Sequence, residues 1–572
     1  MQGGTTIRIA GEAGQGIQTI GMALCRLIND CGYNFLANQD YMSRVRGGNN
    51  YYQVRMDSTR PLAFGQSVDV LVPLNTESIL LHQADLAPKS WIIVDKQHFK
   101  LTESNPQWID APLMALALSA GGTVHYVGSV ALGVLAGLLR INVAILEQSL
   151  HNTFADKGDD IATRNTACAL AGFTIGKKAP LVPLASGSPF SASTRRYLVN
   201  GNESIALGAA YAGCRFYAGY PMTPSTTIME TIAGFSTKYP LVVEQVEDEI
   251  AAINMIIGAS YAGVKSMTAT SGGGFALMTE GLSLAAMLET PIVIVNGQRP
   301  APATGLPTRT EQADLNLVIH AGHGEFARVV YAPGNLEEAF ATTVKAFDCA
   351  DRFQIPAIIL SDQYLADLVY AVDRFYTNDL KRDRHVLSRE QSTAVSDFSR
   401  YELTDTGISV RVVPSWISDV VYADSDEHSA KGHITEDGAV RTAMVNKRFT
   451  KKMNLLRKEI IEPIAINLAY AEIVLLGFGS TRGVIAEVCA TENSKIGAIH
   501  FGQVWPFPGE ALGALLNLAP HARLITVEHN AGAQLAGLIA RETRLIIETS
   551  ILKYNGRPFT IEELSGRIDY VR

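Results

Sequence analysis

The first part of the chain alternates short apolar runs with longer segments in which apolar residues recur at helical spacing. A short apolar run is typical of a buried strand, whereas recurrence every three to four residues predicts an amphipathic helix. The expected strands are TTIRIA (5–10), VDVLVPLN (68–75) and SWIIVD (90–95), and the expected helices cover 16–30 and 127–141. This order predicts an α/β domain over residues 1–180.

A second α/β series begins near residue 200, after a linker at 181–199 that is rich in Pro, Ser and Ala. Its strand candidates are almost wholly apolar, which is typical of a parallel sheet covered by helices on both faces. We therefore predict a doubly wound parallel-sheet domain over residues 200–380. The expected strands are 216–220, 241–246, 266–270, 291–297, 327–332 and 356–362.

The alternation stops at residues 381–455, which are polar, charged and poorly periodic. Four potential metal ligands cluster there, at Asp426, Glu427, His428 and His433. Their spacing fits no standard ligand set, so we predict a solvated connector. A third α/β domain is expected over 456–572, through AEIVLLGFGS and ARLITVEHNAGAQLAGLI.

Composition narrows the function classes. The 572 residues carry a net charge of −8, which gives no sign of nucleic-acid binding. No apolar run is long enough to span a bilayer, and the N-terminus lacks a secretory leader, so we expect a cytoplasmic protein that binds no membrane. The six cysteines are scattered without a CxxC pair, which argues against zinc or an iron–sulfur cluster held within this chain.

A glycine loop follows the first expected strand. GEAGQGI (11–17) has the order GxxGxG, whereas the dinucleotide fingerprint is GxGxxG. Its backbone amides, at a helix N-terminus, suit a phosphate or pyrophosphate, and a tight turn without a ligand explains it equally well. SRVRGGNN (43–50) adds Arg44 and Arg46 as possible anion contacts.

A second corner, AGYPMTPSTTIME (218–230), joins an expected strand to an expected helix. Thr223 stands where an N-cap belongs, and Pro224 suits the first helical position. From spacing alone, helix capping explains the corner. The corner also lies at the carboxyl end of a parallel strand, however, where open α/β sheets bind ligands.

Further polar residues follow the neighbouring strands of the same predicted sheet. Glu247, Asp248 and Glu249 open an apolar helix, so a carboxylate there would be desolvated. SMTATSGGGF (266–275) bends through three consecutive glycines, which allow close approach of the backbone to a ligand. A Gly- and Pro-rich loop after 291–297 carries Arg299, Thr304, Thr308 and Arg309. One sheet edge thus gathers a hydroxyl corner, a buried acid, a glycine turn and an arginine.

In combination, YPMTPST, VEDEIAA, TATSGGGF and ATGLPTRTEQADL resemble the α subunit of the 2-oxoacid:ferredoxin oxidoreductases, which are thiamine diphosphate enzymes. DEHSAKGHITEDG, VWPFPGE and VEHNAGAQL are similar to the rest of that subunit, and GEAGQGI with SRVRGGNN resembles the separate γ subunit. The chain is therefore identified as a γ–α fusion over nearly its whole length. The resemblance implies a γ-type domain, a pyrimidine-binding thiamine diphosphate domain and a transketolase C-terminal-like domain.

The family oxidatively decarboxylates a 2-oxoacid with coenzyme A to acyl-CoA, carbon dioxide and reduced ferredoxin, or runs the reverse carboxylation. The resemblance implies that Glu249 contacts the aminopyrimidine ring, where a proton-sharing carboxyl favours the imino tautomer that creates the carbanion nucleophile. Gly272 and Gly273 are then expected beside the cofactor.

The resemblance also implies the substrate contacts. Arg299 matches the arginine that pairs with the substrate carboxylate, a planar fork suited to that group. Thr223 matches the threonine at the carboxylate or carbonyl end, Tyr220 and Pro221 share its corner, and Thr308 matches a position near the distal end. The family often has glycine after the arginine, whereas this chain has Pro300, which puts the pocket shape and the substrate in doubt.

Coenzyme A is expected at the γ-type domain, with candidate contacts from Gly14, Gln15, Gly16, Ser43 and Arg46. The chain lacks the GDG…N pattern that holds magnesium in this superfamily, and no metal ligand is predicted in it. The family places magnesium, the diphosphate site and a [4Fe–4S] cluster in a β subunit. We therefore expect a β partner, ferredoxin as electron acceptor and an (αβ)2 assembly.

Three points stay open. 2-Oxoglutarate is favoured because the fused two-subunit architecture often goes with it, with pyruvate or branched-chain 2-oxoacids as alternatives. A nucleotide-dependent dehydrogenase is disfavoured by the GxxGxG order. A non-catalytic scaffold that binds CoA or a nucleotide is the remaining alternative.

Overall fold

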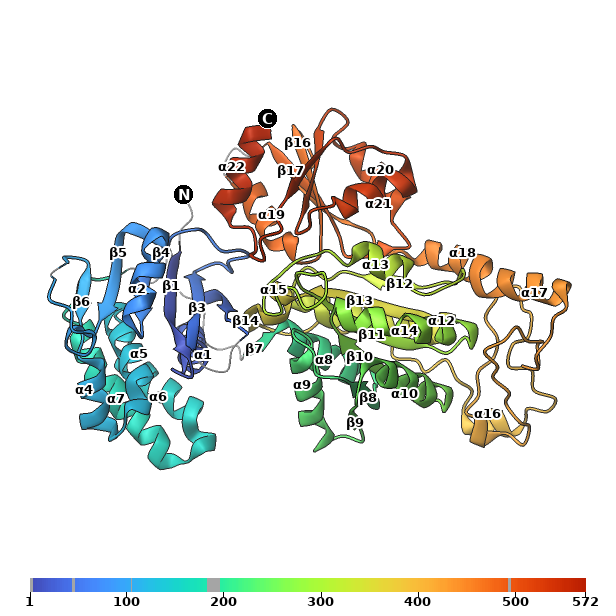
Figure 1. The fold of residues 1–572 in the computed structure, drawn as a ribbon, viewed down its shortest axis with the longest axis horizontal. Helices are drawn as coiled ribbons and strands as arrows, with labels where there is room; N and C mark the ends of the chain where they lie inside the picture. Colours follow the sequence, from blue (N-terminus) through green and yellow to red (C-terminus); the bar gives the residue numbers. More distant parts are fainter. Residues whose placement is uncertain (1–3, 44–46, 104, 183–195, 492–494, 572) are drawn as a thin grey trace. The chain divides into compact units, whose positions relative to one another are not determined.

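The computed structural model describes residues 4–43, 47–103, 105–182, 196–491 and 495–571, which divide into two compact units. Unit 1 comprises residues 1–199, 367–374 and 560–565, and unit 2 comprises 200–366, 375–559 and 566–572. Figure 1 shows that both units combine sheets with covering helices, so the predicted α/β class is confirmed. Most of the predicted linker, residues 183–195, lies outside the described residues.

Unit 1 contains a mixed sheet in the order β6-β5-β4-β1-β3-β2-β14-β7. Its central strand β1 pairs parallel with β4 and antiparallel with β3. The glycine loop lies at the carboxyl end of β1. The strands are β1 (Thr5–Ala13), β2 (Asn34–Asp40), β3 (Gly47–Asp57), β4 (Val68–Pro73), β5 (Leu86–Val94), β6 (Trp108–Asp110), β7 (Tyr197–Asn200) and β14 (Val369–Val372).

Two helices of unit 1 pack at unusually close range. On α5 and α7, a Cβ added at Gly133 would lie 1.9 Å from the carbonyl oxygen of Ala169, and one at Gly172 would lie 2.1 Å from that of Val130. Only glycine permits this backbone contact. The helices are α1 (Ile17–Asp30), α2 (Thr76–Leu81), α3 (Lys96–Phe99), α4 (Leu113–Leu116), α5 (Val127–Leu138), α6 (Val143–Phe154) and α7 (Asp159–Gly176).

Within the described ranges, no single helix combines the length and apolar character needed to cross a membrane. Two segments of unit 1, Leu113–Gly121 and Val124–Leu138, have the required length and apolar composition only when taken together, and the chain bends by 118° between them.

The larger sheet of unit 2 has the order β18-β12-β13-β11-β10-β8-β9, in which every pair is parallel except β12 with β18. Its strands are β8 (Phe216–Gly219), β9 (Val242–Gln245), β10 (Ser266–Thr270), β11 (Ile292–Gln298), β12 (Val329–Tyr331), β13 (Pro356–Asp362) and β18 (Gln503–Trp505). The parallel strands place their carboxyl ends at one edge, as the sequence predicts.

Helices cover both faces of this sheet, which makes it doubly wound. One face is covered by α8 (Gly201–Ala212), α9 (Thr226–Ser236) and α14 (Leu336–Phe353). The other is covered by α10 (Glu249–Tyr261), α11 (Gly272–Leu277), α12 (Thr279–Met287) and α13 (Leu315–His320). The remaining helices before residue 460 are α15 (Gln363–Asp367), α16 (Arg389–Thr393), α17 (Gly438–Val445) and α18 (Lys452–Leu456).

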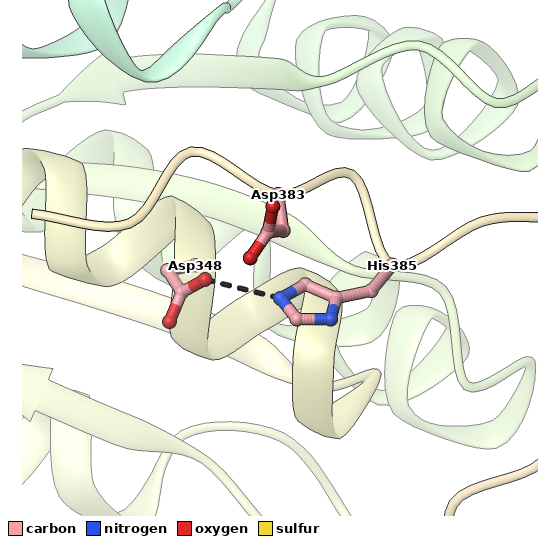
Figure 2. A group of neighbouring side chains, drawn as sticks. All are labelled: Asp348, Asp383 and His385. Carbon is pink, nitrogen blue, oxygen red and sulfur yellow. Dashed lines mark hydrogen bonds and ion pairs between the residues drawn. The ribbon is translucent and has the colours of Figure 1, made fainter.

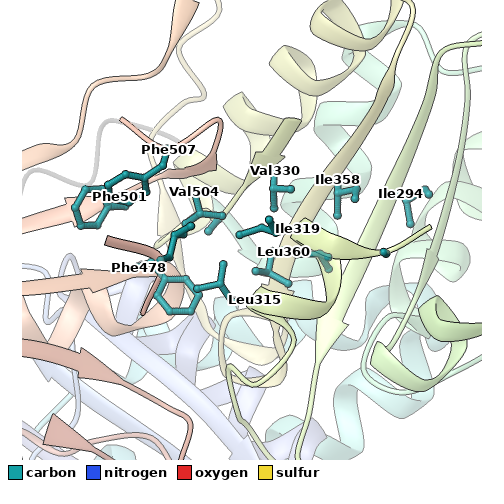
Figure 3. Close-up of a cluster of buried hydrophobic side chains, with 14 of the residues drawn as sticks. Ile294, Leu315, Ile319, Val330, Ile358, Leu360, Phe478, Phe501, Val504 and Phe507 are labelled. Atoms are coloured by element: carbon teal, nitrogen blue, oxygen red, sulfur yellow. The ribbon is translucent and has the colours of Figure 1, made fainter. Parts of the chain in front are cut away.

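A smaller sheet of unit 2 has the order β15-β17-β16-β19-β20. It shares one hydrophobic core with the larger sheet, because Phe478 and Phe501 pack in the same cluster as Leu315 and Leu360 (Figure 3). The strands are β15 (Ile464–Ile466), β16 (Ile473–Phe478), β17 (Ile496–Phe501), β19 (Arg523–Glu528) and β20 (Thr549–Leu552). The helices are α19 (Arg482–Cys489), α20 (Gly509–Leu516), α21 (Gln534–Thr543) and α22 (Ile561–Val571).

The prediction that residues 381–455 form a solvated connector is wrong for part of the segment. His428 is fully buried against the ring of Tyr401, and Glu427 accepts hydrogen bonds from Arg441 and Arg448. The charges of the segment pair with one another over long sequence separations, which a search for hydrophobic periodicity does not detect. The arginine pairs occupy Glu427 and the Tyr401 ring covers His428, which are two of the side chains that had suggested a metal.

The end of the connector adds a buried ion cluster. The Glu289 carboxylate is wholly inaccessible to solvent and accepts hydrogen bonds from the ammonium groups of Lys447 and Lys452, the latter at 2.6 Å. The guanidinium of Arg400 donates to the carbonyl oxygen of Glu289 at 2.7 Å. Burial of two lysines is tolerable only while their shared anion is present.

We expect Glu289→Gln to lower the free energy of unfolding by about 3–5 kcal/mol, because it leaves two buried ammonium groups without an anion. Urea denaturation followed by circular dichroism measures the loss. The matched control is Glu459→Gln, which breaks the more exposed pair with Arg352 and should cost about 1 kcal/mol or less. Equal losses in the two variants would contradict this account of the cluster.

Candidate functional site

The corner at 218–230 lies at the carboxyl end of β8, but its helix begins later than the sequence predicts. The N-cap is Ser225, not Thr223, and α9 starts at Thr226. The reason is a turn at the corner, in which the backbone N–H and the hydroxyl of Ser225 donate to the carbonyl oxygen of Met222, at 2.9 and 2.8 Å. The peptide bond between Thr223 and Pro224 is cis. Because Ser225 is the N-cap, Thr223 does not cap the helix.

Arg299 lies against this corner. It follows β11 directly, and its Nη1 donates to the carbonyl oxygen of Thr223 at 2.7 Å. The side chain is half-buried, and burial lowers the pKa of its guanidinium, which stays charged at neutral pH. Two predicted substrate residues that are distant in sequence are therefore brought together at the same sheet edge.

Glu249 is the first residue of α10 and is only 3% exposed. Its Oε1 accepts a hydrogen bond from the Thr270 hydroxyl at 3.3 Å, at the end of β10. The preceding residue, Asp248, caps the helix through the backbone N–H of Ala251. The predicted burial of this carboxyl is confirmed, although the helix as a whole is buried on one face only, with Ile250 half-exposed.

The glycine turn after β10 joins these parts. The Ser271 hydroxyl donates to the sulfur of Met222 at 2.6 Å, which ties the turn to the corner. A Cβ at Gly274 would lie 2.3 Å from Oε1 of Glu249, so the buried carboxyl faces bare backbone. A Cβ at Gly273 would meet only the carbonyl oxygen of Ala303, at 4.0 Å, which leaves room above the turn.

The loop after Arg299 folds back over itself. The Leu306 N–H donates to the Pro300 carbonyl oxygen at 3.1 Å, so the prolines form a compact turn. Thr308 is buried in this loop, and its carbonyl oxygen accepts from Arg309 at 3.2 Å. Tyr220 is 40% exposed and Pro221 is partly buried.

Two acids at the end of this loop were missed by the sequence interpretation. Burial raises the pKa of Asp314 to about 6, against the opposing effects of its hydrogen bond from Asn296 and the charge of Arg299. Burial, together with the charge of Asp314, raises the pKa of Glu311 to about 7. Their position directly after the Gly- and Pro-rich loop was the available signal.

One group of described residues has metal-ligand geometry, and it lies outside this site (Figure 2). Nε2 of His385 lies 3.0 Å from Oδ1 of Asp348 on α14, and Asp383 lies beside them. Although burial opposes it, the His385 hydrogen bond and the charges of Lys265 and Arg352 hold the pKa of Asp348 below its usual value. This positive surrounding favours a structural attachment of the connector over a cation site.

The neighbours of His385 support that assignment. The guanidinium of Arg382 lies over the ring of Tyr211, and Arg384 donates to the carbonyl oxygen of Gly263 at 2.6 Å. The start of the connector is thus held against the larger sheet domain of unit 2 by contacts from Arg382, Arg384 and His385.

In unit 1, the glycine loop has the geometry of a ligand cradle. Gly14 and Gly16 have φ of +94° and +76°, and added Cβ atoms there would meet nothing within 4 Å. The loop borders two cavities of about 380 and 500 Å³. Gln15 is folded back, with Oε1 accepting from the N–H of Glu12 at 2.7 Å. Ser43 is exposed, and Arg44 and Arg46 lie outside the described residues.

Both parts of the chain match known families. Residues 207–447 match the family described as "Pyruvate flavodoxin/ferredoxin oxidoreductase, thiamine diP-bdg". Residues 6–175 match "Pyruvate ferredoxin/flavodoxin oxidoreductase". The first range contains the corner, the buried acid and the glycine turn, and the second contains the GxxGxG loop.

Individual relatives agree. The 2-oxoacid:ferredoxin oxidoreductase subunit alpha of Sulfolobus sp is 31% identical, over 97% of this chain and 95% of that protein. The 2-oxoglutarate synthase subunit KorA of Methanothermobacter marburgensis is 31% identical, over 66% of this chain and 99% of its own. The structure of 2-oxoglutarate:ferredoxin oxidoreductase from Magnetococcus marinus, with 2-oxoglutarate, coenzyme A and succinyl-CoA bound, matches with a TM-score of 0.91 and 29% identity over 100% of both chains.

Proposed function

The chain belongs to the family of 2-oxoacid:ferredoxin oxidoreductase α subunits, and from this premise we propose that it takes part in oxidative decarboxylation of 2-oxoglutarate with coenzyme A, or the reverse carboxylation. The products would be succinyl-CoA, carbon dioxide and reduced ferredoxin. One observation carries the proposal: a buried carboxyl, Glu249, and an arginine, Arg299, lie at one sheet edge, the first against the three-glycine turn and the second against the corner to which that turn is tied.

The residues at this edge fit the pyrimidine half of thiamine diphosphate. The missing Cβ at Gly274 lets the Glu249 carboxyl lie directly against the turn, and Gly273 leaves room above the turn because a Cβ there would meet only the Ala303 carbonyl oxygen, at 4.0 Å. Bound thiamine diphosphate supplies the electron sink for decarboxylation. Glu249, shielded from water and held by Thr270, would share a proton with a ring nitrogen of the cofactor. Water exclusion strengthens that hydrogen bond.

The substrate would lie against the corner. Arg299 is already oriented by the Thr223 carbonyl oxygen, so its remaining N–H donors can take a carboxylate with little loss of conformational entropy. The Thr223 hydroxyl, together with Tyr220 and Pro221, would contact the same end of the substrate. Thr308 is proposed for the distal end, where 2-oxoglutarate carries its second carboxylate.

The rest of the site would come from a β subunit. We propose that it holds magnesium, the diphosphate end of the cofactor and a [4Fe–4S] cluster, since the six cysteines of this chain are dispersed over both units. Ferredoxin would accept the electrons, and the assembly would be (αβ)2. Coenzyme A would bind at unit 1, where Gly14, Gln15 and Gly16 line a cavity, and Ser43 and Arg46 are proposed as further contacts on the family resemblance alone.

We expect this chain alone to be inactive, because it builds half of the cofactor site. The test expresses it with and without its β partner and measures CoA-dependent viologen reduction by 2-oxoglutarate, pyruvate and a branched-chain 2-oxoacid. The complex should reduce viologen, with kcat/KM highest for 2-oxoglutarate. Comparable turnover by the lone chain would contradict the shared site, and a preference for another 2-oxoacid would correct the substrate.

A further inference from the structure

A second buried carboxyl stands at the glycine turn, on the side opposite Glu249. Asp314 precedes α13 and is 6% exposed. A Cβ at Gly272 would lie 2.2 Å from its Oδ2, whereas the Glu249 carboxyl lies equally close to Gly274. The two acids thus flank one short turn, at which the cofactor and the substrate are proposed to meet.

Asp314 is bound to the strand that leads into Arg299. Its Oδ2 accepts from Nδ2 of Asn296 at 3.3 Å, and its backbone N–H donates to Oε1 of Gln298 at 3.0 Å. The Gln298 amide is held in turn by the carbonyl oxygen of Ser361 at 3.1 Å. Asp314 therefore keeps a fixed position relative to the end of β11.

The carboxyl lacks the compensation that a buried anion needs. No cation among the described residues forms an ion pair with it, and Arg299 acts on it only through space. Oδ1 of Asn296 is also buried and accepts no hydrogen bond. A half-turn of the Asn296 amide would bring this oxygen to a protonated Asp314, which would then donate to it. The neutral acid would supply the donor that the Asn296 oxygen lacks, whereas the ionised acid can only accept from Nδ2 of Asn296 and leaves that oxygen without a donor.

We propose that Asp314 is a positioning residue that controls substrate binding by its charge: when neutral it leaves Arg299 free to pair with the carboxylate of a 2-oxoacid, and when ionised it repels that anion. This inference rests on the proposed function of Arg299. The titratable groups that face Asp314 are Arg299 and Glu311 from the loop and Glu249 across the turn, since β11 and the turn itself contribute none.

The consequence is a pH-dependent KM. Because its pKa is raised to about 6, Asp314 is neutral in acid and becomes ionised as the pH rises through that value. In the assembled αβ complex, we expect the KM for 2-oxoglutarate to rise about tenfold between pH 5.5 and 8. Asp314→Asn, permanently neutral, should keep the low KM across this range. Glu311→Gln should shift the midpoint of the wild-type profile without abolishing it.

A control variant and three possible results distinguish a failure of this inference from a failure of the proposed function. Asp351→Asn is the control, because it removes an equally buried carboxylate paired with Arg411, far from this loop in sequence, and should lower the melting temperature without flattening the KM profile. A flat wild-type profile overturns the inference without any variant. A sloping profile that persists in Asp314→Asn also overturns it. A wild-type complex that turns over no 2-oxoacid overturns the proposed function as well.

Discussion

Replacement of Glu249 by Gln in the assembled complex should lower kcat by about 10²–10⁴-fold, the contribution typical of a positioned acid–base group. Gln keeps the shape of the side chain and can still accept from Thr270, but it cannot share a proton with a ring nitrogen. Because the carboxyl is buried against Gly274, no water molecule can readily replace it. Stopped-flow measurement of 2-oxoacid-dependent electron transfer, at saturating substrate and cofactor, gives the change.

Glu247→Gln is the matched control, since it makes the same replacement two residues away on an exposed side chain. It should leave kcat within about twofold, because exposed substitutions rarely disturb a site. Melting temperatures of both complexes check assembly. An unchanged kcat in Glu249→Gln, with the complex intact, would favour the non-catalytic scaffold over the proposed enzyme.

Strands of the parallel sheet were predictable because their residues are apolar on both faces. PAIILSD was predicted as 356–362, and β13 spans Pro356–Asp362. In contrast, β2 and β3 of unit 1 were not predicted. β3 buries polar side chains, among them Gln53, which accepts from Arg8 at 2.9 Å. Such pairing between strands hides the hydrophobic alternation on which a sequence prediction depends.

Some features of the candidate site were likewise predictable from the sequence, and others were not. The burial of Glu249 followed from the apolar body of its helix, and the family resemblance carried by the motifs is confirmed by the relatives. The contact of Arg299 with Thr223 could not be predicted, because it joins a side chain to a backbone carbonyl 76 residues away. Asp314 was missed because its position after the Gly- and Pro-rich loop, which was the available signal, does not distinguish a buried acid from a solvated one.

Arg299→Ala should lower kcat/KM for 2-oxoacids by at least about 30-fold, since loss of a half-buried charge partner costs roughly 2 kcal/mol or more. The change should lie mainly in KM, because the carboxylate is bound before and during the reaction. Arg299→Lys should recover only part of the loss, because an ammonium group lacks the planar fork. Steady-state kinetics of the αβ complex with 2-oxoglutarate and pyruvate measure both variants.

The comparison between substrates makes this prediction specific. Every 2-oxoacid has the carboxylate that Arg299 is proposed to bind, so the loss should be similar for 2-oxoglutarate and pyruvate. Thr308→Val should instead affect 2-oxoglutarate more, because pyruvate lacks a distal carboxylate. Arg328→Lys is the control, as this buried arginine donates to the Val318 carbonyl oxygen and is not proposed to touch substrate. A loss in Arg299→Ala confined to one substrate would move Arg299 from the shared carboxylate to the distal end of the pocket.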